Sequence, residues 1–300
     1  MNTTLHILLL LTLAPLLPGV ITRTKSILAG RTGPPLLQPC FDLLKLLRKE
    51  MVVSTTTTWV FRAGPAVALA ATLLAGLLLP LGPLPAVLSF SGDLVLFATL
   101  LGLARFAITA AALDTGSAFE GLGASRELTF ACLTEPAIFL ALLVLVRLSG
   151  SLSLGPMLGS AAAAGALGAA PLAMIAIGLF VVLLAETSRM PVDDPTTHLE
   201  LTMIHEVMVL DHSGPLLGAI HYGAALKLLV LGSLWLQVAL PFRTGLFWPD
   251  CLLMVLELLA LAVAIGVVES IMARLRMRQV PYLLMGALLF CGFGFLLLVR

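Results

Sequence analysis

The sequence predicts an all-α, polytopic membrane protein of about eight transmembrane helices. Of its 300 residues, 60% are hydrophobic and 11% are charged, whereas a soluble domain usually has about 25% charged residues. The apolar residues form separate stretches, each near the roughly 20 residues that cross a bilayer core of about 30 Å. With so few charges the chain cannot cover a soluble core of its own size, so lipid must solvate much of its surface.

The apolar stretches follow one another along the whole chain. Residues 4–22 are expected to be the first membrane helix rather than a signal peptide, because no Lys or Arg precedes the run and no small-residue cleavage pattern follows it. We therefore expect a single integral membrane domain, residues 1–300. Its spans are predicted at 4–22, 63–82, 94–113, 128–149, 167–186, 220–241, 251–272 and 280–299.

The basic residues indicate the orientation. Eight spans put both termini on one side of the membrane and the first, third, fifth and seventh loops on the other. Those four loops hold 12 of the 17 Lys and Arg residues. The positive-inside rule then predicts that these loops are cytoplasmic and that both termini lie outside. The 12 residues are Arg23, Lys25, Arg31, Lys45, Arg48, Lys49, Arg62, Arg126, Arg189, Arg274, Arg276 and Arg278.

Charge and motifs exclude several classes of function. The net charge of +1 favours neither a nucleic acid nor an acidic substrate as partner. The four cysteines lie far apart and lack the spacing of metal, iron–sulfur or disulfide sites. The sequence contains no Walker loop, no dinucleotide-binding glycine fingerprint and no nucleophile elbow. The cysteines are Cys40, Cys132, Cys251 and Cys291.

The first inner loop, residues 23–62, contains a predicted amphipathic helix. From Phe41 to Glu50, apolar and charged residues alternate at helical spacing, with Leu44 on one side and Lys45 on another. Such a helix lies at the membrane interface. It is either a simple lipid anchor or part of a docking surface for a cytoplasmic protein, and we favour docking. The charged residues that we assign to this surface in the first loop are Arg31, Asp42, Lys45, Arg48 and Lys49.

The second inner loop leads into the fourth span, where Glu135 precedes Pro136. A carboxylate at that depth is costly unless it is protonated, paired or facing water. Glu135 is therefore a candidate for an ion relay, the alternative being a carboxyl hydrogen-bonded inside the bundle. Arg126, in the loop itself, is assigned to the docking surface.

The third inner loop, residues 187–219, has the highest density of polar residues. Asp194 is expected to cap a helix that begins at Pro195 and ends near Leu210. Its His and acidic residues lack the HExxH pattern of a zinc site, so we interpret them as a hydrated, titratable cluster. We assign Arg189 and Asp193 to docking. The acids at and within this loop that we assign to the relay are Glu186, Glu200, Glu206 and Asp211.

Three further ionisable residues lie in later spans. Lys227 is about two turns into the sixth span, and a buried Lys loses its proton readily, which suits a relay. The alternative for Lys227 is a charge that snorkels or is fixed by a carboxylate. Glu257 and Glu269 are equally compatible with a relay and with a structural role, and they stay outside our set.

Several of these strings resemble the subunit 1 family of respiratory complex I. The strings are residues 31–50, Glu135-Pro136 and Ala185-Glu186-Thr-Ser-Arg189-Met-Pro191, with Asp193 and Pro195 beyond it. Within the family, the compact first loop and residues 113–128 resemble the branch of membrane-bound, energy-converting [NiFe] hydrogenases. The chain departs from the family at Asp211-His212, where Glu-Tyr is usual. It also departs at His198 and His205, where family members are acidic or apolar.

The resemblance implies a membrane anchor and ion-coupling subunit of a formate hydrogenlyase-type [NiFe] hydrogenase complex. The expected partners are the soluble hydrogenase large and small subunits, iron–sulfur proteins and antiporter-like membrane subunits, in a bacterial or archaeal cytoplasmic membrane. The [NiFe] centre and iron–sulfur clusters would lie in those partners. The chain itself would hold no catalytic residue, metal or cofactor. Two alternatives stay open: a quinone-pocket subunit of a complex I-type NADH dehydrogenase, and a stand-alone ion transporter.

Overall fold

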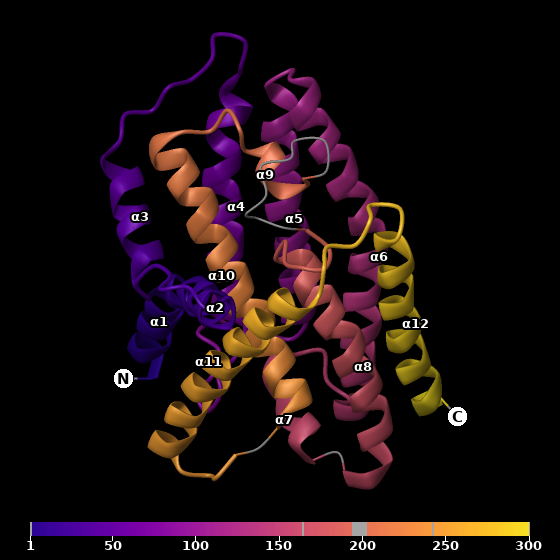
Figure 1. The fold of residues 1–300 in the computed structure, drawn as a ribbon. Helices are drawn as coiled ribbons and strands as arrows, with labels where there is room; N and C mark the ends of the chain where they lie inside the picture. Colours follow the sequence, from indigo (N-terminus) through magenta and orange to yellow (C-terminus); the bar gives the residue numbers. More distant parts are fainter. Residues whose placement is uncertain (1, 164, 194–202, 242, 300) are drawn as a thin grey trace.

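The computed structural model describes residues 2–163, 165–193, 203–241 and 243–299. Within these ranges the secondary structure is α-helical, with one isolated β-bridge between Leu81 and Leu84 and no strand. Eight helical segments are long and apolar enough to cross a membrane. The predicted all-α, polytopic fold is therefore confirmed, and Figure 1 shows the helices packed as one bundle.

Each spanning segment overlaps a predicted stretch. The first is interrupted at Pro15, because a proline ring inside a helix removes a backbone hydrogen bond, so α1 (Asn2–Leu13) and α2 (Leu16–Leu28) share one span. The other spans are α4 (Trp59–Leu78), α5 (Asp93–Asp114), α6 (Ala118–Ser149), α8 (Gly165–Glu186), α10 (Gly214–Ala239), α11 (Phe247–Ile271) and α12 (Val280–Val299).

Three shorter helices complete the described chain. The amphipathic helix expected in the first inner loop is present as α3 (Gln38–Arg48), and none of its residues is buried. The helix α7 (Leu154–Ala163) lies between the fourth and fifth spans and was not predicted. The third is α9 (His205–Met208).

The predicted helix from Pro195 to Leu210 is wrong for the described part of that segment. Only α9 is helical there, while residues 194–202 lie outside the described residues. Asp194 and Pro195, where we expected the cap, lie outside the described residues, and at the start of α9 the Oδ2 of Asp193 accepts the backbone N–H groups of Ile204 and His205 at 3.2 and 3.1 Å. Tertiary contact fixes this short helix against α6 at Gly123, where an added Cβ would lie 2.3 Å from the side chain of Val207.

Close helix contacts at glycine hold the bundle together. A Cβ at Gly64 would lie 2.7 Å from the carbonyl oxygen of Ala107, so α4 and α5 touch through their backbones. A Cβ at Gly178 would lie 2.5 Å from the sulfur of Cys291, which brings α8 equally close to α12. Small residues at such contacts let membrane helices gain dispersion energy where lipid supplies no hydrophobic driving force.

The four basic loops lie together at one end of the bundle. The backbone N–H and hydroxyl of Thr58 donate to Asp114 at 2.7 and 2.8 Å, which joins the first loop to the second. Val52 donates to Ser213 Oγ at 3.0 Å, joining the first loop to the third. The N–H of Leu275 donates to the carbonyl of Pro191 at 3.0 Å and joins the third to the fourth. Figure 1 shows both termini in the lower half of the view, away from these loops.

The side of the membrane on which this end lies stays a prediction, and labelling tests it. In a background without native cysteines, Lys45→Cys and Arg276→Cys should react with an impermeant maleimide only from the cytoplasmic side, because the basic loops are retained there. Thr3→Cys and Thr244→Cys should react only from outside. Labelling of positions 45 and 276 from opposite sides would contradict the arrangement.

Candidate functional site

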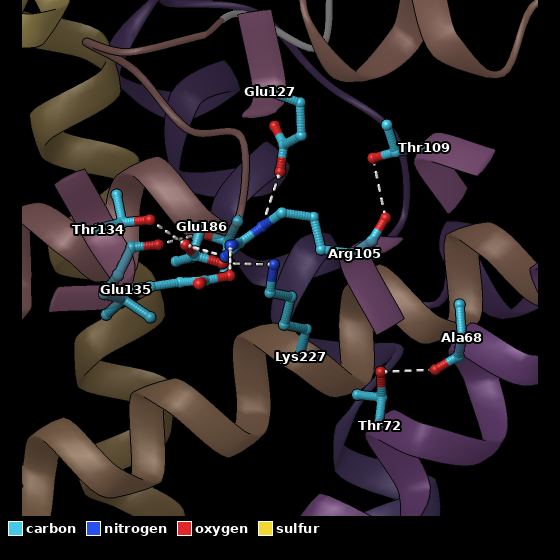
Figure 2. A network of polar contacts seen from close by, with 11 residues as sticks. Ala68, Thr72, Arg105, Thr109, Glu127, Thr134, Glu135, Glu186 and Lys227 are labelled. Carbon is cyan, nitrogen blue, oxygen red and sulfur yellow. Dashed lines mark hydrogen bonds and ion pairs between the residues drawn. The ribbon is translucent and has the colours of Figure 1, made fainter. Parts of the chain in front are cut away.

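The site is centred on Arg105, a cation in the middle of the apolar helix α5. The residue is only 7% exposed. A buried charge inside a membrane span needs partners close by, because neither lipid nor a dry interior solvates it. Arg105 is placed by an α-helix that is otherwise apolar near it, so its guanidinium reaches away from α5 toward α6 and α8 (Figure 2).

Three carboxylates surround this guanidinium. Its two terminal nitrogens donate to Glu135 in α6 and to Glu186 at the end of α8. Its Nε lies 3.4 Å from Glu127 Oε1, also in α6. Glu127 and Glu135 are eight residues apart on one helix, a spacing that returns both side chains to the same face. One side chain of α5 therefore ties two other helices together.

Glu186 is the most enclosed carboxylate, with a side chain that is 3% exposed. Its Oε2 lies 2.6 Å from the Nζ of Lys227 in α10, and its Oε1 accepts the hydroxyl of Thr134 at 2.6 Å. The network therefore spans α5, α6, α8 and α10, as Figure 2 shows. We call the five charged residues Arg105, Glu127, Glu135, Glu186 and Lys227 the Arg105 network.

With all its members ionised, the Arg105 network contains one more negative charge than positive charges. Such a cluster is strongly coupled, because removing or adding one charge in a low-dielectric site changes the energy of every neighbour. A proton taken up by one carboxylate would relieve the excess. The cluster is thus suited chemically to hold, exchange and respond to a proton or another small cation.

Two cavities meet beside the network. A small one of about 80 Å³ is lined by Arg105, Glu127, Glu186 and Lys227, and it has room for a few waters. A large one of about 1150 Å³ lies between α2, α3, α10 and α11. Both are lined by Thr187, Ser188 and His205. Burial lowers the pKa of His205 to about 4, so this imidazole is neutral at neutral pH.

A second ion cluster lies on the wall of the large cavity. The carboxylate of Glu269 is 2.9 Å from Lys25 Nζ and 3.5 Å from an Arg189 nitrogen, and its side chain is fully buried. Burial lowers the pKa of Arg189, and the Glu269 carboxylate opposes that effect. This cluster joins α2, α11 and the segment after α8.

The structure brings together three of the six residues that we assigned to a relay. Glu135, Glu186 and Lys227 come together in the Arg105 network, while Glu206 lines the large cavity instead. Asp211 lies apart, with its backbone N–H donating to Glu120 at 3.1 Å. Glu200 and His198 lie outside the described residues. The relay role itself stays a prediction for all of them.

The residues that we assigned to docking divide into exposed and internally bonded sets. Arg31, Asp42, Lys45, Arg48 and Lys49 are exposed on and beside α3. Arg126 donates to the carbonyl of Met203 at 2.9 Å, Arg189 pairs with Glu269, and Asp193 pairs with Arg274 at 2.9 Å. Docking stays a prediction, and the exposed set is better placed for it.

Sequence reasoning missed Arg105, Glu127 and Thr134. Arg105 is detectable, because a charged residue inside a span needs a nearby partner by default. Glu127 lies at a predicted span boundary, where a carboxylate is common and does not by itself indicate a site.

Among the described residues no three His, Cys, Asp or Glu side chains gather in a metal-binding group.

Comparison with known proteins gives consistent matches over nearly the whole chain. The NADH dehydrogenase family model matches residues 2–300. Formate hydrogenlyase subunit 4 of Escherichia coli (strain K12) is 30% identical over 294 residues, which cover 96% of this chain and 93% of that protein. Hydrogenase-4 component C of the same organism is 33% identical over 274 residues, covering 89% and 85%.

A solved structure shares the fold. A chain of the membrane-bound sulfane sulfur reductase, an archaeal respiratory membrane complex, superposes with a TM-score of 0.82 at 23% identity. The superposition covers 99% of this chain and 98% of that one. At this identity the likeness establishes the arrangement of helices.

Proposed function

The chain belongs to the NADH dehydrogenase family of complex I subunit 1-like, multi-pass membrane proteins, and from this premise we propose that it is the membrane anchor and ion-coupling subunit of a [NiFe] hydrogenase complex of the formate hydrogenlyase type. It anchors the soluble large and small hydrogenase subunits and iron–sulfur proteins. It links their redox chemistry to movement of protons or sodium ions through antiporter-like membrane subunits. The complex resides in a bacterial or archaeal cytoplasmic membrane, with both termini of this chain outside.

The Arg105 network is the observation that carries this proposal. It joins three carboxylates and two cations within the spans, beside a cavity that reaches toward the basic loops. Electron transfer in a docked partner changes the charge near those loops. In a low-dielectric site such a change shifts the proton affinity of the nearest carboxylates. Chemistry at the metal belongs to the partner, and this chain is not itself catalytic.

The position of Glu135 supports a membrane partner beside α6. Its side chain is 47% exposed on the outside of the bundle, although it lies within a span. An ionised carboxylate that faces lipid there is costly. We therefore infer that an antiporter-like subunit covers this face and continues the polar route from Glu135.

The α3 region supports a soluble partner. The backbone carbonyl oxygen of Glu50, just beyond α3, lies 2.8 Å from where a Cβ of Gly214 would be, and Val52 bonds to Ser213. The basic end of α3 and the end of the third loop thus form one continuous surface. Arg48 and Lys49 lie on it, both exposed.

Charge reversal tests the docking. Arg48→Glu with Lys49→Glu should release the soluble subunits during gentle detergent purification while the membrane bundle stays inserted, because opposed charges become like charges across the interface. Co-purification and metal content measure the outcome. Arg276→Glu with Arg278→Glu is the matched control, since both residues are exposed in the fourth loop. An intact complex after reversal at 48 and 49 would leave α3 as a lipid anchor only.

Glu135 tests the coupling. Gln at this position keeps a hydrogen-bonding group for Arg105 but cannot titrate. Glu135→Gln should therefore assemble normally and lose partner-dependent ion uptake in sealed vesicles, while Glu135→Asp should keep part of it. Glu257→Gln, which removes a carboxyl in α11 outside the network, should pump as the wild type does. Full ion uptake by the Gln variant would make Glu135 a structural residue and move the relay to Glu186, Glu200 and Glu206.

The large cavity favours a second candidate, a quinone-pocket subunit of a complex I-type NADH dehydrogenase, because about 1150 Å³ accommodates a quinone head and tail. Stoichiometric quinone in the purified complex would support this candidate. A stand-alone ion transporter is the third candidate, and purification without soluble subunits would support it.

A further inference from the structure

The large cavity has an apolar interior and a wall that is rich in charge. Its apolar surface includes Pro18 of α2, Leu43 and Leu46 of α3, and Leu217 of α10. Because α3 and the first inner loop border it, the cavity lies at the end of the bundle where the basic loops gather. An amphiphilic molecule fits such a site better than a fully polar or a fully apolar one.

The ion cluster of Lys25, Arg189 and Glu269 leaves the cavity wall with one uncompensated positive charge. Two nitrogen atoms there are buried, Arg189 Nε and His205 Nε2, and neither has a hydrogen-bond partner among the residues that the structure describes. Both residues line the cavity. A buried donor or acceptor that is left unbonded destabilises the folded state. This part of the wall is therefore incomplete without an oxygen-bearing ligand.

The part of the wall nearer α3 is positive as well. Arg31, Lys45 and Lys49 line it, and within the described chain none of them forms an ion pair. Asp42 and Glu206 are the carboxylates on this part, and Asp42 accepts a hydrogen bond from Gln38 at 2.9 Å. The histidines aside, the wall as a whole has two more cations than carboxylates, since Lys and Arg contribute five and Asp and Glu three.

We propose that this cavity binds one anionic phospholipid. Its phosphodiester would lie among the cations, and its acyl chains would cover the apolar residues of α2, α3 and α10. Basic pockets between membrane helices at the cytoplasmic side recognise anionic headgroups in this way. A neutral quinone would leave the excess positive charge uncompensated. The bound lipid holds α3 against α10, and Arg31, Lys45 and Lys49, which also belong to the proposed docking surface, face it from the cavity wall.

Lipid titration tests the proposal. The intact complex is purified in detergent, delipidated and titrated with phosphatidylglycerol or phosphatidylcholine, and bound lipid is counted by native mass spectrometry. The wild type should bind one phosphatidylglycerol and prefer it to phosphatidylcholine. Arg31→Gln with Lys45→Gln should weaken phosphatidylglycerol binding about twenty-five-fold, because each cation contributes about a factor of five.

Two matched variants distinguish the loss of this site from a general loss of positive charge and from misfolding. Arg276→Gln with Arg278→Gln removes the same charge from exposed residues outside the cavity and should leave binding unchanged. Arg31→Lys with Lys45→Arg keeps the charge and should keep most of the affinity. Equal affinity for the two lipids, equal loss in the 276/278 variant, or a quinone that displaces the phospholipid stoichiometrically would each overturn the proposal.

Discussion

A single guanidinium inside an apolar bundle sets the main constraint on this structure. Arg105 is placed by α5 where neither lipid nor bulk water solvates it, so α6 and α8 must bring carboxylates to it. Glu186 in turn needs Lys227 of α10, since one guanidinium cannot neutralise three acids. The close contact of α4 with α5 at Gly64 backs the same helix from the other side. The packing of the helices and the pairing of the buried charges therefore depend on each other.

The same arrangement explains why a structural cluster is suited to function. A cluster with an odd number of charges has no arrangement in which every charge is paired, so its proton content depends on its surroundings. Buried pairs of this kind contribute little net stability over apolar packing. A protein that served only as a membrane anchor would therefore not need them. The small cavity beside them, and the neutral His205 between the two cavities, connect the cluster to the end where partners are proposed to dock.

Most of the fold follows from the sequence, because a bilayer requires long apolar helices. The length and the flanking charges of such a helix can be read from one continuous stretch of residues. The eight spans and the amphipathic α3 needed no tertiary information. The third loop did: α9 is much shorter than the predicted helix and its first N–H groups bond to Asp193, and both the contact of α9 with Gly123 and the pairing of Asp193 with Arg274 are long-range. Glu135, Glu186 and Lys227 could be singled out as costly residues in spans. Arg105 could have been singled out in the same way, but its pairing with Glu135 and Glu186 could not, because hydropathy does not show which helices are neighbours.

The most direct test of the central constraint is a double-mutant cycle between Arg105 and Glu186, measured as the free energy of unfolding in mixed micelles. Arg105→Gln should cost about 3–5 kcal/mol, because it leaves buried carboxylates unpaired. Adding Glu186→Gln should restore part of that loss, with a coupling of about 1–3 kcal/mol, while adding Glu257→Gln should be additive. Strict additivity of Arg105→Gln and Glu186→Gln would contradict the account, because it would mean that the guanidinium and the carboxylate do not depend on each other.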